Sequence, residues 1–343
     1  MMKKSIVAVT VAVLLIIAGI AIACSAFIMT DFSLEGFATE SFEETTCTIE
    51  GDFNHVLIAT QEHDLTILPS ENGECKIVFD KNKAQKNEYA PEYAIDSDTL
   101  VINIVDNRKW FDHIGIFSGE VSMTLYLPES RYVSLTAATD TGDITVSEKL
   151  SFTGSSVATS TGDIKFLAKI DGELALATST GDITVSDQEL ISLDASVSTG
   201  EIFIENVKAT GRITLSGSTG RTELHSVEAD GITSKGSTGD ILLKNVYVEK
   251  DIFIERGTGD VTLTSVLSDS FVIKTSTGDV KLNLSDADSI EITTDTGRVD
   301  AILLTEKIFK CESSSGNIKI PDTHSGGNCR VKTSTGNIHI TID

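Results

Sequence analysis

The sequence predicts an all-β fold, a single-stranded β-solenoid of about 11 regular rungs of 19–20 residues, with irregular N-terminal coils and one preceding transmembrane helix. A Ser-Thr-Gly-Asp-Ile phrase recurs at steps of 19 or 20 residues, and a fixed period near 20 is typical of repeat architectures. Apolar residues alternate with period two on both sides of each repeat glycine, which indicates strands. An uncharged stretch near the amino terminus is long enough to span a bilayer. The repeat glycines are Gly142, Gly162, Gly181, Gly200, Gly220, Gly239, Gly259, Gly278, Gly297, Gly316 and Gly336.

The amino terminus predicts a membrane anchor. Residues 1–4 form a short cytoplasmic tip with two lysines, and residues 5–29 form the uncharged apolar run. Basic residues before the run and acidic residues after it favour an orientation in which the amino terminus is cytoplasmic and the rest of the chain lies outside the membrane. We expect a single-pass anchor in the cell membrane with the C-terminal region extracytoplasmic. Two alternatives remain, a lipoprotein signal with lipidation at Cys24 and an ordinary cleaved signal peptide, and both also place residues 31–343 outside.

Residues 30–52 are an acidic spacer without a clear period. Cys47 lies in this spacer and Cys75 lies in the strand region that follows. In an oxidising compartment the two could form a disulfide, and two free thiols are the alternative that the sequence leaves open.

Residues 53–130 predict irregular N-terminal β coils and a cap. Short apolar runs bounded by polar turns indicate strands at 55–58, 65–68, 76–79, 100–104 and 121–127. The second of two polar insertions contains Trp110 and Phe111. These aromatic side chains could bind a partner or the membrane, or the loop could fold back over the open end of the core. Terminal repeats are expected to be atypical because an uncovered end must be closed.

Residues 131–343 predict the regular solenoid. Apolar residues occupy the positions seven and five residues before each glycine and two and four residues after it, and the residues between them are mostly polar. Each repeat is therefore a strand, a glycine turn, a second strand and a second turn. Stacking the rungs about 4.8 Å apart would bury the apolar columns in a thin core about 50 Å long. Ile183 and Ile202 should then point inward in adjacent layers. An antiparallel meander is the alternative, but it leaves an apolar sheet face uncovered.

Two late cysteines fall in apolar columns. Cys311 and Cys329 are offset by one rung and two residues, and diagonal neighbours of this kind lie roughly 7–8 Å apart. That separation is too long for an unstrained disulfide. We expect two buried, unpaired thiols that pack as small hydrophobic groups.

The residue after each glycine forms a largely acidic column, which includes Asp143, Asp163, Asp182 and Glu201. Stacked carboxylates could form calcium sites. Alternatively, each side chain could accept hydrogen bonds from its own turn. Arginine interrupts the column twice and asparagine replaces the acids at its C-terminal end, which favours the second interpretation.

Composition excludes some function classes. The chain has 51 acidic and 27 basic residues, a formal charge of −24, whereas nucleic-acid binding proteins carry a basic footprint. The acids repeat evenly instead of clustering, and the six histidines are scattered without metal-ligand spacing. We therefore expect no enzymatic activity, no catalytic residues, no cofactor and no metal site.

The recurring S-T-G-D-I-x-V phrase resembles the bacterial β-strand-repeat family of putative adhesins, a domain family of unknown function. The strand at 100–102 and the 121–127 run that ends at Pro128 are similar to that family's amino-terminal portion. The resemblance covers roughly residues 50–343. It implies an extracytoplasmic solenoid, often membrane-tethered, in bacterial envelopes, and it supplies no catalytic residues.

The sequence thus leads to a membrane-anchored extracytoplasmic solenoid with a binding, adhesion-like or scaffolding role at the bacterial cell envelope. Its expected partners are the membrane, through residues 5–29, and an envelope protein or glycan. The oligomeric state and the handedness of the solenoid stay open. One alternative function is an accessory role in envelope-stress signalling, with Trp110 and its loop contacting a membrane partner. The other is a carbohydrate-active β-helix enzyme.

Overall fold

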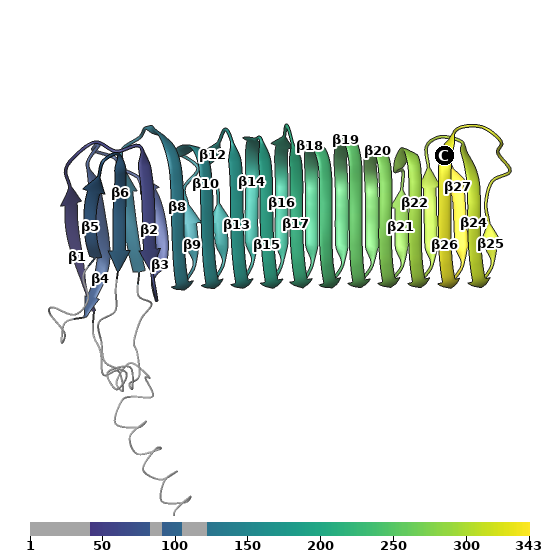
Figure 1. The fold of residues 1–343 in the computed structure, drawn as a ribbon, viewed down its shortest axis with the longest axis horizontal. Helices are drawn as coiled ribbons and strands as arrows, with labels where there is room; N and C mark the ends of the chain where they lie inside the picture. The colour runs from purple at the N-terminus through teal and green to yellow at the C-terminus, as the bar shows by residue number, and fades with distance from the viewer. Residues whose placement is uncertain (1–41, 83–90, 105–121) are drawn as a thin grey trace, which may run out of the picture. The chain divides into compact units, whose positions relative to one another are not determined.

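The computed structural model describes residues 42–82, 91–104 and 122–343, which are built from strands and turns (Figure 1). Nearly all of these residues belong to one compact unit. The predicted anchor at residues 5–29, Cys24, Trp110 and Phe111 lie outside the described residues. Within the described ranges, no helix is long and apolar enough to cross a membrane.

The regular part of the chain forms two layers of parallel strands. Each predicted glycine turn from Gly142 to Gly336 joins a strand of the first layer to a strand of the second. In spatial order, the first layer holds β8 (Arg131–Thr141), β10 (Ser151–Thr161), β13 (Glu173–Thr180), β15 (Ser192–Thr199), β17 (Arg212–Thr219), the second halves of β18 (Thr222–Thr238), β19 (Ile241–Thr258) and β20 (Val261–Thr277), then β22 (Asp286–Thr296), β26 (Gly327–Thr335) and β24 (Lys307–Ser315). The short β12 (Lys169–Ile170) also pairs with β10.

The second layer follows the same course. It holds β9 (Ile144–Val146), β11 (Ile164–Phe166), β14 (Ile183–Leu190), β16 (Ile202–Ala209), the first halves of β18, β19 and β20, then β21 (Val280–Asn283), β23 (Val299–Leu303), β27 (Ile338–Ile342) and β25 (Ile318–Lys319). Because β18, β19 and β20 continue through the second turn without a break, the two layers are joined along the middle of the unit.

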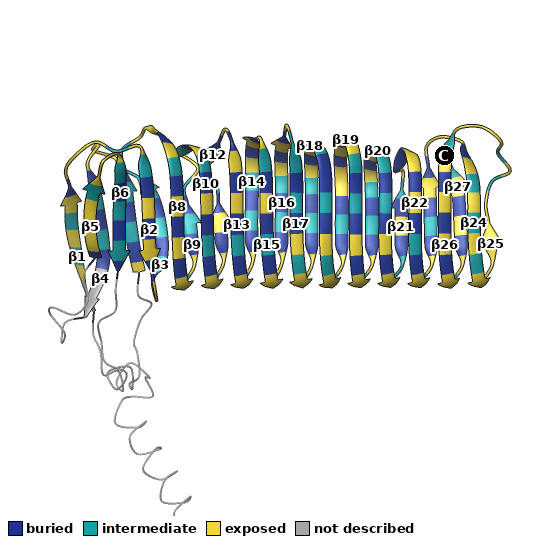
Figure 2. Cartoon of the chain, viewed as in Figure 1, coloured by how far each residue is buried: buried dark blue, intermediate teal, exposed yellow. Residues whose placement is uncertain are grey.

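The predicted β-solenoid and its core are confirmed. Ile183 lies beside Ile202 in the register of β14 and β16, and Leu174 lies beside Leu193 in that of β13 and β15. All four side chains are at most 1% exposed. Figure 2 shows the resulting alternation of buried and exposed residues along each strand. The predicted apolar columns therefore line the space between the two layers.

The first turn of each rung requires glycine for two reasons. The backbone has a positive φ there, and the turns of adjacent rungs lie in close contact. Gly181 has φ +139°, and a Cβ built on it would lie 2.0 Å from the carbonyl oxygen of Gly162 in the preceding rung. A side chain at this position would collide with backbone atoms that cannot move aside. The turn glycines thus allow the rungs to stack at strand spacing.

The rungs do not stack in sequence order at the C-terminal end. The last rung, β26 and β27, inserts between the β22–β23 rung and the β24–β25 rung, so β24 and β25 become outermost. Lys307 of the outer rung reaches past the inserted strand to Asp286, with 2.7 Å between Nζ and Oδ1. Both side chains of this ion pair are buried.

This order corrects the expectation for the late cysteines. Both are free, and Cys329 is buried as expected, but Cys311 is only half-buried. Cys311 lies in β24, which is an outermost strand. If the rungs stacked in sequence order, β24 would have a neighbouring strand on both edges. Burial raises the pKa of the Cys329 thiol to about 12 and that of Cys311 to about 11.

The amino-terminal end contains a similar insertion. The rung formed by β2 (His55–Thr60) and β3 (Asp64–Pro69) lies between the rung of β6 (Thr99–Ile104) and β7 (Ser122–Leu127) and the rung of β8 and β9. These strands and β4 (Cys75–Asn82) occur where the apolar runs predicted strands.

Antiparallel strands flank this end. β4 pairs with β7, and β5 (Pro91–Asp96) pairs with β6, while β1 (Phe42–Ile49) pairs with β4. Figure 1 shows β1, β4 and β5 beyond the first parallel strands. Cys47 and Cys75, whose pairing the sequence left open, are free thiols.

Candidate functional site

The acidic column forms a hydrogen-bond ladder along the first turns. The Oδ1 atom of Asp143 accepts the backbone N–H of Asp163 at 2.7 Å, and Oδ1 of Asp163 accepts that of Asp182 at 2.7 Å. The same contact joins Asp182 to Glu201 and Asp260 to Asp279. The expectation of bonds within each turn is therefore wrong, because the side chain reaches the adjacent rung.

The ladder explains how like charges can stack. Each aspartate of the ladder gains a backbone N–H donor, and a charge-assisted bond of this kind is stronger than a neutral one. Arg298 closes one stretch of the column: its backbone N–H and its guanidinium both donate to Asp279, and these bonds lower the pKa of that carboxyl. Across the described ranges, no group of three or more His, Cys, Asp or Glu side chains could hold a metal ion.

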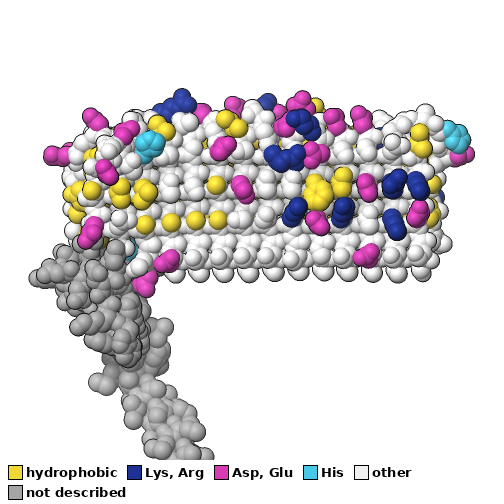
Figure 3. All heavy atoms as spheres, viewed as in Figure 1, with side chains coloured by type: hydrophobic (Ala, Val, Ile, Leu, Met, Phe, Trp, Pro, Cys, Tyr) yellow, Lys and Arg dark blue, Asp and Glu magenta, His cyan; other side chains and the backbone are white. Residues whose placement is uncertain are grey.

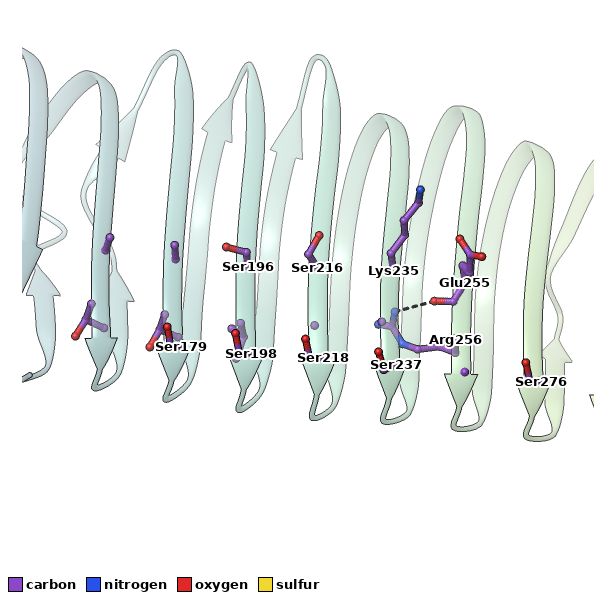
Figure 4. Close-up of a pocket in the computed structure, with 18 residues that line it drawn as sticks. Ser179, Ser196, Ser198, Ser216, Ser218, Lys235, Ser237, Glu255, Arg256 and Ser276 are labelled. Atoms are coloured by element: carbon purple, nitrogen blue, oxygen red, sulfur yellow. Dashed lines mark hydrogen bonds between the residues drawn. The ribbon is translucent and has the colours of Figure 1, made fainter. Parts of the chain in front are cut away.

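A shallow trough runs over the outer face of the first layer. It crosses the strands from β10 to β20, close to the glycine turns, and has a volume of about 710 Å³. Most of its lining side chains are small, and many carry a hydroxyl (Figure 4). They include Ala158, Ala177, Ser179, Ser196, Ser198, Ser216, Ser218, Ser237 and Ser276. At strand spacing, the seven strand positions from β10 to β20 extend over roughly 29 Å.

An aromatic ring and a charged row lie beside the β18–β20 end of the trough, which Lys235 and Glu255 line. Phe253 is half-buried, and the Lys235 and Lys274 ammonium groups lie 5.4 Å and 5.7 Å from the centre of its ring. Glu255 lies between the same two lysines in the strand register. Figure 3 shows a hydrophobic patch on this face with basic side chains beside it. Because the lysines are exposed, this end can attract an anionic group while the ring packs against an apolar surface.

Arg256 lies beneath this charged row, inside the solenoid. It is 3% exposed, and its guanidinium donates to Ser234 Oγ at 3.0 Å, Thr222 Oγ1 at 3.2 Å and the Glu255 carbonyl at 3.1 Å. Burial lowers its pKa to about 10. Among the described residues, no acidic side chain forms an ion pair with it.

Space for this guanidinium comes from neighbouring rungs. A Cβ on Gly236 would lie 2.7 Å from Nη1 of Arg256. Ser234 and Thr222 replace the apolar residues that other rungs have in the same columns. Small or polar residues in adjacent rungs thus surround one buried guanidinium. Because these residues break the apolar columns, they are the sequence feature from which a buried polar site could have been predicted.

The residues singled out from sequence for partner binding or lipidation, Trp110, Phe111 and Cys24, lie outside the described residues, and their roles stay predictions. The aromatic ring and the lysines at the β18–β20 end of the trough were missed because Phe253, Lys235 and Lys274 occupy outward positions, which the repeat pattern describes only as a polar face. Their proximity depends on register across three strands.

Comparison with known proteins identifies relatives of the solenoid. A model of the Toastrack DUF4097 family matches residues 53–267 and 228–343. No curated protein matches the sequence.

Several solved structures are similar to the chain at low identity. A putative lipid binding protein from Parabacteroides distasonis is 16% identical, with a TM-score of 0.42, over 72% of this chain and 96% of that one. A putative adhesin from Parabacteroides merdae is 11% identical, with a TM-score of 0.43, over 74% and 98%. A putative cell adhesion protein from Clostridium sporogenes is 10% identical, with a TM-score of 0.26, over 88% and 100%. Sequence identities and TM-scores this low carry no information about function.

Proposed function

The chain belongs to the Toastrack DUF4097 family, and on that premise we propose that it is a binding protein of the bacterial cell envelope. In this proposal residues 5–29 anchor the chain in the cell membrane and the solenoid lies outside it. The solenoid binds an extended envelope polymer along the trough and performs no chemistry on it. This role extends the adhesion-like or scaffolding function expected from the sequence.

The trough is the observation that carries the proposal. Its hydroxyl groups can both donate and accept hydrogen bonds, and they repeat at strand spacing from β13 to β18, with a further serine on β20. A polymer whose polar groups also repeat could therefore contact several rungs at once, and many weak contacts add to useful affinity. Phe253 supplies a ring face for a flat apolar surface, and Lys235 and Lys274 supply positive charge. This combination fits an anionic glycan.

The proposal predicts a selective loss of binding. Full-length protein in detergent is mixed with purified cell-wall glycan that carries anionic groups, and the bound fraction is measured by co-sedimentation. Phe253→Ala combined with Lys235→Gln should weaken binding about tenfold or more, which corresponds to roughly 1.4 kcal/mol. Binding by the unaltered protein should also weaken at high salt because the lysine charges are exposed and screened.

Tyr247→Ala is the matched control. Tyr247 is an aromatic residue on the same strand, β19, and is 56% exposed, but it lies in the first half of that strand, which belongs to the second layer, whereas Phe253 lies in the second half beside the trough. Equal binding by the control and the Phe253 double variant would contradict the proposal, as would absence of binding by the unaltered protein. Release of soluble sugar fragments in the same assay would instead favour the carbohydrate-active enzyme.

A further inference from the structure

The C-terminal end of the solenoid is an open strand edge. β24 is paired along one edge with β26, and no strand of the described part of the chain pairs with its other edge. An edge strand presents free N–H and C=O groups that can pair with another chain. At the other end of the unit, by contrast, the antiparallel strands β4 and β5 flank the parallel rungs.

Apolar side chains accompany this edge. Ile308 is 50% exposed and Ile318 is 42% exposed, while Phe309 and Cys311 are half-buried although they occupy core columns. Proline is one device by which proteins protect an edge. Pro321 follows β25, but β24 contains no proline across its nine residues. β24 is therefore the edge available for pairing.

The charge pattern of β24 is complementary to itself. Lys310 and Glu312 flank Cys311, and both are exposed on the outer face. If two copies of β24 pair antiparallel around Cys311, Lys310 of each copy lies directly opposite Glu312 of the other. Opposite charges in such cross-strand positions stabilise pairing, and like charges oppose it. An in-register parallel pairing would place Lys310 opposite Lys310.

The charge balance at this end also permits association of two copies. Residues 306–343 contain five basic residues and four acidic ones, a formal charge of +1, whereas the whole chain carries −24. Charges farther than about 8 Å are largely screened at physiological ionic strength. Repulsion between two acidic chains is therefore weakest where their C-terminal ends meet.

We infer that two copies of the chain associate end to end through antiparallel pairing of β24 with β24 of the second copy, about a two-fold axis at Cys311. The interface is isologous, as in most homodimers. It continues the first layer from one copy into the other and covers the exposed Ile308 and the half-buried Phe309. Closure of the edge in this way also removes a template for uncontrolled strand addition.

Thiol cross-linking of the full-length chain in detergent tests the pairing. Opposed residues in an antiparallel pair have Cβ atoms about 4.5–5.5 Å apart, close enough for Cys311 to bridge to its copy with small movements. Copper–phenanthroline oxidation at pH 9 should give a covalent dimer on non-reducing gels. Cys311→Ser should abolish this dimer, and Cys47→Ser should leave it unchanged.

Charge exchange then tests the register. Lys310→Glu alone and Glu312→Lys alone each place like charges opposite one another, and each should reduce the Cys311 dimer at least fivefold. An equimolar mixture of the two differently tagged variants should restore it as a mixed dimer, because their charges are complementary. Thermal unfolding followed by circular dichroism checks that both variants fold.

Rescue in the mixture is the decisive result, since neither a folding defect nor a different partner would produce it. Three outcomes would overturn the inference: no Cys311 dimer from the unaltered chain, a dimer unaffected by either single change, or failure of two folded variants to cross-link with each other.

Discussion

At the scale of single residues, position within the stack decides the chemistry of otherwise equivalent side chains. Cys329 and Cys311 both occupy apolar columns, yet Cys329 is 2% exposed and Cys311 is half-buried. The difference arises because β26 is covered on both edges and β24 on one. Arg256 shows the same dependence, since its burial relies on small residues in neighbouring rungs.

The buried Cys329 thiol predicts a stability that depends on pH. Burial raises its pKa from 9.0 to about 12, so the unfolded chain loses this proton at lower pH than the folded chain. The contribution of the neutral thiol is fully present below pH 9 and is lost as pH rises from 9 toward 12. Relative to Cys329→Ala, the unaltered chain should lose roughly 1–2 kcal/mol of unfolding free energy between pH 8 and pH 10.

Urea unfolding at the two pH values measures this difference. Cys75 and Tyr132 also have pKa values raised by burial, but they are present in both proteins and cancel. Parallel stability curves for the two proteins would show that Cys329 does not contribute.

At the scale of elements, a bend after the first residues of the second-layer strand has a conformational requirement of its own in several rungs. Several non-glycine residues, six positions after the repeat glycine, have left-handed backbone angles near φ +55°. They are Asp187, Asn206, Ser226, Asn245, Ser265 and Leu284. Asparagine and aspartate tolerate this conformation better than other side-chain-bearing residues. Leu284, with φ 49°, is the least suited of the six.

Leu284→Asn should therefore stabilise the solenoid by about 1 kcal/mol, because it relieves backbone strain at an exposed position. The midpoint of urea unfolding should rise with an unchanged slope. Asn206→Leu is the reciprocal variant, and it should lower stability by at least as much because it also removes the bond from Asn206 Nδ2 to Asp187 Oδ1. A lower midpoint for Leu284→Asn would contradict this account of the bend.

At the scale of the whole unit, both ends of the solenoid are interlocked by an inserted rung. At the C-terminal end the chain forms the outer rung β24–β25 and then returns to place β26–β27 inside it. At the amino-terminal end β2–β3 comes first, and the later rungs β6–β7 and β8–β9 are added on its two sides. Residues separated in sequence by about two rungs thus become neighbours, and each outer rung depends on the rung inserted behind it. Stability at the ends is therefore less local than in a simple stack.

Deletion of residues 327–343 tests this interlocking. In the observed order, removal of β26 and β27 takes away the only parallel neighbours of β24 and β25. Hydrogen exchange in residues 307–319 should then rise to the rate of unfolded chain, while residues 261–283 stay protected. With sequential stacking, residues 307–319 would instead remain protected by the preceding rung.

The regular rungs could be predicted because their information is local. Alternating apolar residues define two strands, the glycine defines the turn between them, and identical columns bring Ile183 beside Ile202. The β-solenoid, its core and its free late cysteines follow from these patterns. The aromatic and basic cluster beside the trough did not follow, because Phe253, Lys235 and Lys274 meet only when three outward faces are aligned.

By itself, the sequence determined which residues face the core, where each rung turns and how far each rung extends, since these depend on backbone preference and on alternation within about 20 residues. Only the tertiary structure decided the order of the end rungs, the exposed edge at β24 and the burial of Arg256. The physical reason is that the rungs present nearly identical apolar columns, so local pattern cannot distinguish one neighbour from another, and the choice is made by contacts between segments distant in sequence.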